Sequence, residues 1–546
     1  MRDFKDIQSI DFRAELAKVP SAVLKWPECQ PRILVVTDGL SFETTNGFGL
    51  TQFISSLATG TIHGMTPQIK KASRGGALPG ADIPNFKFDD PAQGLLKSRY
   101  DVVFILGINS EGGAPGVSGQ LPQSEIDAVA RFMQAGGGVF ATGDHQSLGA
   151  AISRDLPRVR SMRFWKNAET PDVANEMRLS TNVSGPNEVE DFNDQSDRRP
   201  QSLYPNFRTQ AGNGLGAIGK PALAHPLLQL PATATVPHPV IEVFPDHPHE
   251  GECHVPTNGA TTFQLDSANV NEWPAATAGG ALMPEVVAMT MSHGSGFPTG
   301  PTGAKTALLP RAFVSICAYD GQRANVGRVA TDATWHHFVN INIDGTGESG
   351  AIGLRDAGTP PTDTADLTKI RQYYRNLATW LMPKNVRRCR LIPSIVDELR
   401  LYPLYEELVI PRPNPPDPGP FVDIGRQVVA SMAQRSPAWE AESMLQDALA
   451  EAVGEVAAER LLASGWQVGR LGSRDLAYGA LGAMTISALV TLSKAKDAKD
   501  IVAHKTFDTP AKKAAVEIVR ELVAQQRTDL KQLDVLLEHI DNAKTM

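Results

Sequence analysis

Residues 121–149 read LPQSEIDAVARFMQAGGGVFATGDHQSLG, and this stretch decides the fold class. It begins like a helix, because Pro122 lies in the first turn and Glu125 lies near the positive end of the helix dipole. Apolar side chains keep helical spacing until Gly136–Gly138 end the helix. An apolar strand, 139–142, then turns into a further helix. Such alternation predicts a parallel sheet with its functional site at the C-terminal ends of the strands.

The same alternation continues on both sides of this stretch. Apolar runs at 32–38 and 100–108 predict two more buried strands, with a helix expected at 49–58. Residues 166–300 are rich in Pro, Asn, Gly and Thr, and we expect them to form long loops and insertions over the sheet. We therefore predict a flavodoxin-like, doubly wound α/β fold with a mostly parallel sheet. Later elements are expected as strands at 240–244, 285–291, 311–318 and 326–332, and as a helix at 367–381.

A proline-rich segment divides the chain. Residues 411–420 read PRPNPPDPGP, which neither a helix interior nor a sheet tolerates, so they are expected to form a semi-rigid linker. The predicted order is an N-terminal helical extension (1–30), the α/β domain (31–410), the linker, and an all-helical domain (421–546). Helical periodicity in the last part places helices at 439–462, 474–492, 510–525 and 528–543.

Bulk composition restricts the classes of function. The 546 residues include 52 Lys+Arg and 60 Asp+Glu, a net charge of −8, so no basic surplus exists for nucleic-acid binding. The N-terminus lacks the apolar stretch of a signal peptide. Cysteines are distant and form no CxxC motif, so neither a secreted disulfide framework nor a zinc finger is expected, and the cytoplasm is the expected location. These cysteines are Cys29, Cys253, Cys317 and Cys389.

The most apolar run of the chain is residues 477–492, AYGALGAMTISALVTL. It is shorter than the ~20 residues that span a bilayer, and it contains two glycines. A buried helix is the preferred interpretation, with membrane insertion as the alternative.

Residues 136–149, GGGVFATGDHQSLG, resemble the segment of class I glutamine-amidotransferase-like proteins that leads through a strand into the nucleophile elbow. They are also similar to the ThuA-like branch of that superfamily. The resemblance covers roughly residues 30–385, with insertions, and it implies the superfamily's fold. True amidotransferases carry a cysteine at the elbow, where this chain has Asp144 and His145. Glutaminase chemistry is therefore excluded.

A second resemblance lies in residues 326–337, VGRVATDATWHH. In ThuA-like proteins a Gly-Arg-Val strand ends in a histidine beside the elbow, which implies that His336 or His337 reaches Asp144 and His145. Asp38, at the end of the first strand, completes the candidate catalytic set. Three structural alternatives stay open: Asp144 caps the following helix, the histidine pair lies on a strand with one member in the core, and Asp38 closes a turn.

Residues 246–254, DHPHEGECH, concentrate imidazole and carboxylate groups. Such mixed sets suit a divalent metal, Zn²⁺, Mn²⁺ or Fe²⁺, which would lower the pKa of a bound water toward ~7. An exposed polar loop is the alternative, because no fixed ligand spacing is present. The candidate metal ligands are Asp246, His247, His249, Glu250, His254, His145 and His337.

One further cluster is basic. Residues 154–163, RDLPRVRSMR, offer Arg158, Arg160 and Arg163 to an anionic group of a substrate. A solvated surface with paired acids is the more common origin of such a run.

Three functions follow as hypotheses. The first is a metal-assisted hydrolase of a polar small molecule or glycan-like substrate. The second is a catalytically silent domain that senses a ligand or a protein partner, with 421–546 mediating self-association or partner binding. The third, a membrane-acting effector using 477–492, is disfavoured by the polar flanks and the negative charge.

Overall fold

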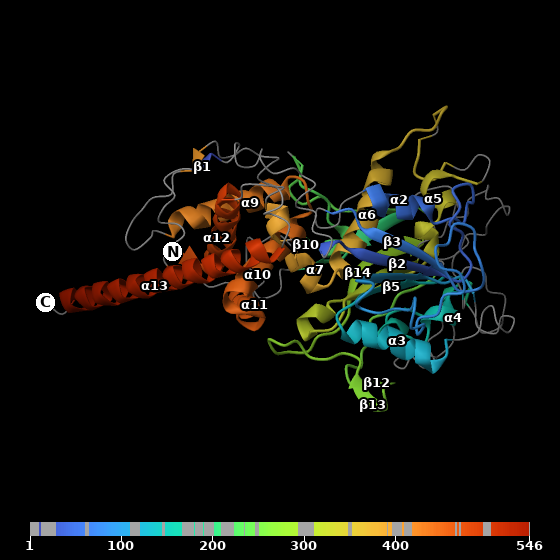
Figure 1. Ribbon diagram of the computed structural model, residues 1–546, viewed down its shortest axis with the longest axis horizontal. Helices are drawn as coiled ribbons and strands as arrows, with labels where there is room; N and C mark the ends of the chain where they lie inside the picture. Colours follow the sequence, from blue (N-terminus) through green and yellow to red (C-terminus); the bar gives the residue numbers. More distant parts are fainter. Residues whose placement is uncertain are drawn as a thin grey trace.

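The chain forms an α/β domain joined to a helical region, as Figure 1 shows. The computed structural model describes residues 10–11, 29–59, 65–109, 121–144, 148–165, 179–180, 189–190, 201–208, 223–233, 235–245, 251–292, 311–347, 352–356, 358–389, 391–395, 407–408, 418–464, 467–468, 471–494 and 504–544.

Nine strands form the central sheet in the order β11-β8-β14-β15-β16-β5-β4-β2-β3. The last five in this order are parallel to one another. Numbered along the chain, they have the order 2-1-3-4-5, which defines the flavodoxin-like doubly wound fold. The predicted fold class is therefore confirmed. The parallel strands are β2 (Arg32–Thr37), β3 (Gln68–Ser73), β4 (Val102–Leu106), β5 (Gly138–Thr142) and β16 (Val329–Asp332).

The parallel strands are buried on both faces, which explains their continuous apolar runs. In β2, Ile33 and Val35 face one hydrophobic core, and Leu34 and Val36 face the other. Helices α2 (Thr51–Thr59) and α6 (Ala365–Leu381) cover the first face, whereas α3 (Gln123–Gln134) and α4 (Ala150–Ser153) cover the second (Figure 1). Successive crossovers on alternate faces place all parallel strands with their C-terminal ends at one edge.

The other half of the sheet is antiparallel. Part of it comes from the segment 166–300, where the sequence predicts long loops and insertions with strands at 240–244 and 285–291. Both predicted strands are present, as β11 and β14, and the expectation of loops is corrected for β8 of the central sheet and for a separate hairpin, β12 (Thr262–Leu265) with β13 (Ala268–Asn271). The antiparallel strands are β15 (Arg311–Tyr319), β14 (Glu285–Ser292), β8 (Gln201–Pro205) and β11 (Val243–Phe244).

The C-terminal region is helical, as predicted, but its helix boundaries differ. Helix α9 precedes the first expected helix, and α13 replaces the two expected at 510–525 and 528–543 with one continuous helix. The apolar run 477–492 lies inside α12, where its apolar side chains belong to the core of this region. Among the described residues, no helix is long and apolar enough to cross a membrane. The helices are α9 (Gly419–Ala433), α10 (Ala438–Val453), α11 (Glu455–Ser464), α12 (Ser473–Lys494) and α13 (His504–Lys544).

Helices α9 and α12 pack with their backbones in direct contact. A Cβ atom added at Gly482 would lie 1.8 Å from the carbonyl oxygen of Phe421, and one added at Gly425 would lie 2.0 Å from that of Tyr478. The glycine within the apolar run is thus a packing requirement of the helical core.

The helical region and the α/β domain share a polar junction. Arg387, on α7 (Lys384–Cys389), donates to both carboxylate oxygens of Asp447 on α10 at 3.2 and 3.1 Å. Each of the two side chains is only 6% exposed. Trp439 of α10 packs into the core of the α/β domain, and its backbone N–H donates to Gln229. These contacts fix the helical region against the sheet domain.

Two of the predicted connecting segments are described only in part. Within the expected N-terminal helical extension, Ile10–Asp11 form a short strand, β1, that pairs with Glu407–Leu408 (β17). The end of the proline-rich linker, Gly419 and Pro420, already belongs to the first turn of α9, where proline is tolerated. Residues 411–417 lie outside the described residues.

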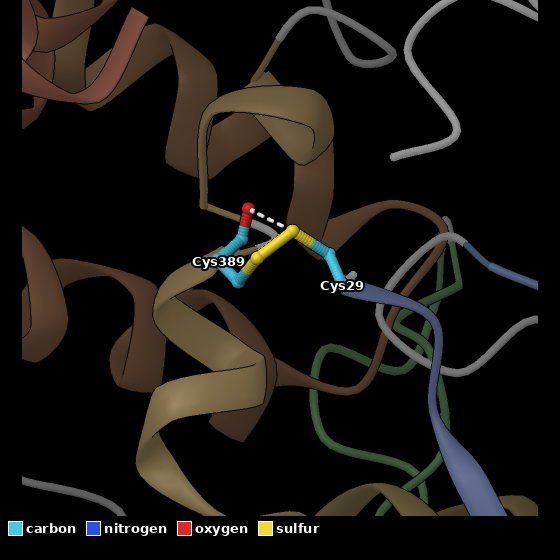
Figure 2. The surroundings of a disulfide bond; sticks show 2 residues. All are labelled: Cys29 and Cys389. Carbon is cyan, nitrogen blue, oxygen red and sulfur yellow. Dashed lines mark hydrogen bonds between the residues drawn. A yellow bond between two sulfur atoms is a disulfide. The ribbon is translucent and has the colours of Figure 1, made fainter. Parts of the chain in front are cut away.

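Cys29 and Cys389 form a disulfide, although they are 360 residues apart in sequence (Figure 2). Their Cα atoms are 5.4 Å apart, a usual separation for a disulfide. Sequence spacing did not suggest this pair, because the two cysteines form no CxxC motif and lie far apart in the chain. Cys253 and Cys317 are free and buried. The cytoplasmic location stays a prediction, and a disulfide weighs against it, because disulfides persist mainly in oxidising compartments.

Candidate functional site

The C-terminal ends of four parallel strands meet in register at one edge of the sheet. Thr37 pairs with Leu106, Leu106 with Thr142, and Thr142 with Asp332. The loops that follow these residues therefore start side by side. The strand order also reverses between β2 and β4, and ligands of open α/β sheets bind at such a switch point.

Asp144 follows β5 at this edge and is almost fully buried. The Thr334 hydroxyl, from the loop after β16, donates to Asp144 Oδ1 at 2.7 Å. Asp144 also has its backbone N–H bonded to the carbonyl of Leu148, which closes the turn. The carboxylate is thus held across two strand ends. Its side chain reaches the loop after β16 and does not simply cap the helix that follows.

His336 lies against Asp144. Its Nε2 atom is 3.5 Å from Asp144 Oδ2, and its side chain keeps 14% of its surface exposed. We expected the histidine pair on a strand, and this is corrected: both belong to a 3-10 turn, η5 (Trp335–Phe338). The backbone N–H of His336 donates to the Thr334 hydroxyl, so one threonine positions both members of the pair.

Aromatic rings surround the exposed side of His336. The Trp335 ring stacks on the imidazole with centroids 4.2 Å apart, and Phe48 contacts both rings edge-on. Phe48 is 46% exposed, which is unusual for a side chain of its size. The candidate site therefore combines an acid–imidazole pair with one exposed aromatic ring, that of Phe48, and one buried ring, that of Trp335.

The side chain of His337, unlike that of His336, is completely buried. Its Nδ1 atom lies 2.8 Å from Asp332 Oδ1, and because a carboxylate only accepts, Nδ1 carries the proton. The Tyr373 hydroxyl donates to the other oxygen of Asp332, and Phe244 stacks on the imidazole. Nε2 of His337 has no hydrogen-bond partner within the described part of the chain. The two candidate histidines thus serve two different carboxylates.

Arg163 joins the loops of the site. Its guanidinium is fully buried and donates to the carbonyl oxygens of Asp144 (2.8 Å), Ala333 (2.7 Å), Asp332 (3.2 Å) and Phe164 (2.8 Å). Burial lowers the pKa of this guanidinium. Neither sequence interpretation of Arg163, a hold on an anionic substrate or a solvated surface with paired acids, is correct, because the side chain is buried and backbone carbonyls occupy its donors.

The histidine-rich segment 246–254 ends at this same place. The Phe164 N–H donates to the backbone carbonyl oxygen of Glu252, and Cys253 pairs with Arg163 in an isolated antiparallel β-bridge. A Cβ atom at Gly251 would lie 2.3 Å from the carbonyl oxygen of Ala333 and 2.4 Å from Arg163 Nη2. Only glycine fits there, so this segment is anchored against the loop that carries Thr334 and His336.

The predicted metal ligands are only partly described. His145, Asp246, His247, His249 and Glu250 lie outside the described residues. His254 is described and packs on Phe164, with Nδ1 3.5 Å from the carbonyl oxygen of Ser161. Across the described ranges, no group of three or more His, Cys, Asp or Glu side chains is close enough to hold a metal ion.

Asp38 lies at the switch point. Ile108 N–H and Asn109 N–H donate to its Oδ1 at 2.6 and 3.2 Å, and the Asn109 amide donates to its carbonyl oxygen. Asn109 also accepts from the N–H groups of Gly149 and Ala151, and so connects Asp38 to the segment after Asp144. Burial raises the pKa of Asp38 from 3.8 to about 6, against the opposing effect of the Ile108 and Asn109 N–H groups.

This pKa makes the stability of the fold depend on pH. Because its pKa is higher in the folded state than in the unfolded state, the carboxyl group of Asp38 favours folding most below about pH 4, where it is protonated in both states. This contribution to the free energy of unfolding is lost as the pH rises through about 6. The difference between the folded and unfolded pKa of Asp38 corresponds to up to about 3 kcal/mol. We expect Asp38→Asn to gain stability relative to wild type by this amount between about pH 4 and pH 8, in urea unfolding at a series of pH values.

The exposed Asp89 supplies the matched control for this pH series. Asp89→Asn is expected to follow the wild-type pH profile throughout. A wild-type minus Asp38→Asn difference that stays constant across the series would contradict the buried, titrating carboxyl.

The strand order and the edge site define the class of the α/β domain as a flavodoxin-like fold with an Asp–His pair at its switch edge. No family model matches the chain, and no curated protein matches it. Among solved structures, it is similar to a putative ThuA-like protein from Parabacteroides merdae, with 9% identity over 65% of this chain and 91% of that chain and a TM-score of 0.26. The fold assignment therefore rests on the strand order and not on this likeness.

Proposed function

We propose that the α/β domain is a hydrolase of a polar small molecule or glycan-like substrate, with Asp144 and His336 as its catalytic pair. The observation that carries the proposal is the 3.5 Å approach of a partly exposed imidazole to a buried carboxylate. A site at the C-terminal edge of a parallel sheet is also where this fold class places its ligands.

Each partner has a role that follows from its surroundings. His336, the accessible member, takes a proton from a water molecule as that water attacks the substrate, and returns the proton to the leaving group. Asp144 stabilises the imidazolium that forms between these two steps. Thr334 keeps the carboxylate and the histidine backbone in place, so that little reorganisation is needed.

The exposed aromatic ring supports the substrate class. The exposed Phe48 offers an apolar surface beside the imidazole, and the buried Trp335 supports the imidazole by stacking on it. The C–H face of a sugar ring packs on such a surface, while its hydroxyl groups hydrogen-bond to the polar groups that complete the pocket.

A divalent metal is the alternative form of the proposal, in which His336 Nε2 would bind the ion and would not itself take the proton from the water. Two ligand atoms of a tetrahedral Zn²⁺ site, each at about 2.1 Å from the ion, lie about 3.4 Å apart, close to the separation of His336 Nε2 and Asp144 Oδ2. Thr334 then supplies the hydrogen bond that commonly orients a ligating carboxylate. His145, the next residue in the chain, is the third candidate ligand. Such an ion would lower the pKa of a bound water and supply the nucleophile.

The test compares wild-type protein with Asp144→Asn and His336→Ala on chromogenic glycosides, carboxyl esters and phosphoesters, with and without added Zn²⁺, Mn²⁺ or Fe²⁺. We expect each variant to lose at least about 100-fold in kcat, as is usual when a general acid–base group is removed. His238→Ala, at an exposed histidine, is the matched control and should keep full activity.

Elemental analysis of the same preparations tests the metal. Metal bound to wild type and to His238→Ala, but lost from Asp144→Asn and His336→Ala, would support it. A wild-type protein inert toward all three substrate classes, or a His336→Ala variant as active as wild type, would overturn the hydrolase proposal.

A second candidate function is a catalytically silent ligand or partner sensor. The observation that favours it is helix α13, which projects beyond the rest of the helical region in Figure 1 and exposes Leu530. A helix that leaves the core in this way suits self-association or partner binding through 421–546. This function predicts no turnover in the same assays and a mass above 58.7 kDa by light scattering.

A further inference from the structure

A second unusual cluster surrounds Arg158, on the opposite side of the α/β domain core from α2 and α6. Arg158 has no exposed surface, and its Nε donates to the carbonyl oxygen of Glu272 at 2.9 Å. Its two terminal nitrogens, Nη1 and Nη2, have no hydrogen-bond partner among the residues that the structure describes. The guanidinium lies over the rings of Phe263 and Tyr319, at 5.8 and 5.9 Å from their centroids.

Two neighbouring side chains also have buried donor atoms without a hydrogen-bond partner. The hydroxyl of Tyr319 and Nε1 of Trp273 are both buried and without a hydrogen-bond partner in the described ranges. Their rings pack edge to face, with centroids 5.0 Å apart, so that Tyr319 contacts both Arg158 and Trp273. Four donor atoms on three adjoining side chains therefore lack an acceptor.

The acceptor nearest to the cluster is already used. The carboxylate of Glu272 accepts from Arg160 Nε and Nη2, at 3.2 and 2.9 Å, and from the backbone N–H of Arg158. The guanidinium of Arg160 thus takes both oxygens of this carboxylate. Among described residues, the guanidinium of Arg158 donates only to the backbone carbonyl of Glu272, which leaves its positive charge without a hydrogen-bonded carboxylate. A buried charge is costly unless it is paired, and ring contacts alone compensate only a part of that cost.

The backbone conformation of Arg158 is also unusual and is a second sign of a ligand site. Arg158 has φ 68° and ψ −51°, a left-handed conformation that side chains other than glycine rarely adopt. Such conformations persist where the surroundings enforce them, and they are common at ligand sites. Burial also lowers the pKa of the guanidinium, a cost that a bound anion would remove.

We propose that Arg158, Tyr319 and Trp273 form an internal receptor for a small oxyanion, a carboxylate or a phosphate. A planar guanidinium matches either group, because two parallel N–H donors fit two oxygens. Tyr319 pairs with Val329 at the start of β16, whereas Asp332 ends that strand. The receptor is therefore about 10 Å along the strand from the Asp144–His336 edge, and it does not depend on the hydrolase proposal.

The experiment is a melting and calorimetric titration of the full chain with sodium phosphate and, separately, sodium acetate, against sodium chloride at equal ionic strength. One of the two oxyanions should raise the melting temperature of wild type by at least about 2 °C, in a saturable manner. Phosphate alone, or acetate alone, identifies which chemistry the receptor takes.

Three variants make the result specific. Arg158→Met should abolish the shift, and Tyr319→Phe, which removes only a hydroxyl, should weaken binding about three- to tenfold. Arg131→Met, at an exposed arginine paired with Asp266, should respond like wild type. The proposal is overturned if neither oxyanion, at on the order of tens of millimolar, stabilises wild type more than Arg158→Met.

Discussion

Asp447→Ala is expected to lower the free energy of unfolding by about 3–5 kcal/mol, because it leaves a buried guanidinium without its carboxylate. Arg387 donates two hydrogen bonds to Asp447, and both side chains are almost fully buried between α7 and α10. The remaining donor of Arg387 goes to Gln322, which cannot replace a charge. Urea unfolding followed by tryptophan fluorescence measures the loss, since Trp439 lies at this junction.

Two variants separate the buried pair from a general helix effect. Asp423→Ala removes a carboxylate that is 66% exposed and pairs with Arg426, so its cost should stay within about 0.5 kcal/mol. The double variant Arg387→Met with Asp447→Leu should recover most of the loss, because an apolar pair of similar volume has no desolvation cost. If Asp447→Ala and Asp423→Ala cost the same, the junction does not depend on this pair.

The parallel half of the sheet could be predicted from the sequence because its strands are buried on both faces. Runs such as 32–38 and 100–108 are mostly apolar, and turn residues follow them. The apolar pattern and the turn residues therefore predict the same strand boundaries. Strand β3, QIKKAS, lies at the edge of the sheet and alternates exposed with half-buried residues. Its lysines suit an edge strand but resemble a surface loop in sequence.

Three strands of the antiparallel half were predicted, but β8 and the pairing of these strands were not, because the pairing is not local. Strand β8 pairs with β14, more than 80 residues later, and only tertiary contacts select that partner. The same reason applies to the helical region, where α13 runs through Pro510 as one helix. Pro510 is the seventh residue of this helix, beyond the first turn in which proline is usually tolerated, so the helix begins before the residue that the sequence suggests as its start.

The candidate site was predictable where topology alone decides it. Strand ends in register bring Asp144 and His336 to one edge, whatever the loops between them do. The roles of Asp332 and Thr334 needed coordinates, although a polar residue directly after an apolar strand was a visible signal. Arg163 was misjudged because composition does not show whether the partners of an arginine are solvent, acids or buried carbonyl groups.

Loss of the Cys29–Cys389 disulfide is expected to destabilise the protein by about 2–5 kcal/mol, because it releases one of the longest loops that a chain of this size can close. The bond joins Cys29, shortly before β2, to the end of α7, whose Arg387 holds the helical region. Cys29 is itself buried in the helical core. Thermal unfolding of wild type with and without dithiothreitol measures the effect, after peptide mapping without reductant has shown the bond.

Cys29→Ser makes this prediction specific to the bond. The variant should unfold at a lower temperature than oxidised wild type, and added reductant should change it no further, because Cys253 and Cys317 are free thiols. Reduced wild type should then resemble the variant. If reductant leaves the melting temperature of the mapped, oxidised protein unchanged, the packing of α7 against α10 alone holds the two regions together, and the disulfide adds nothing that the Arg387–Asp447 pair does not supply.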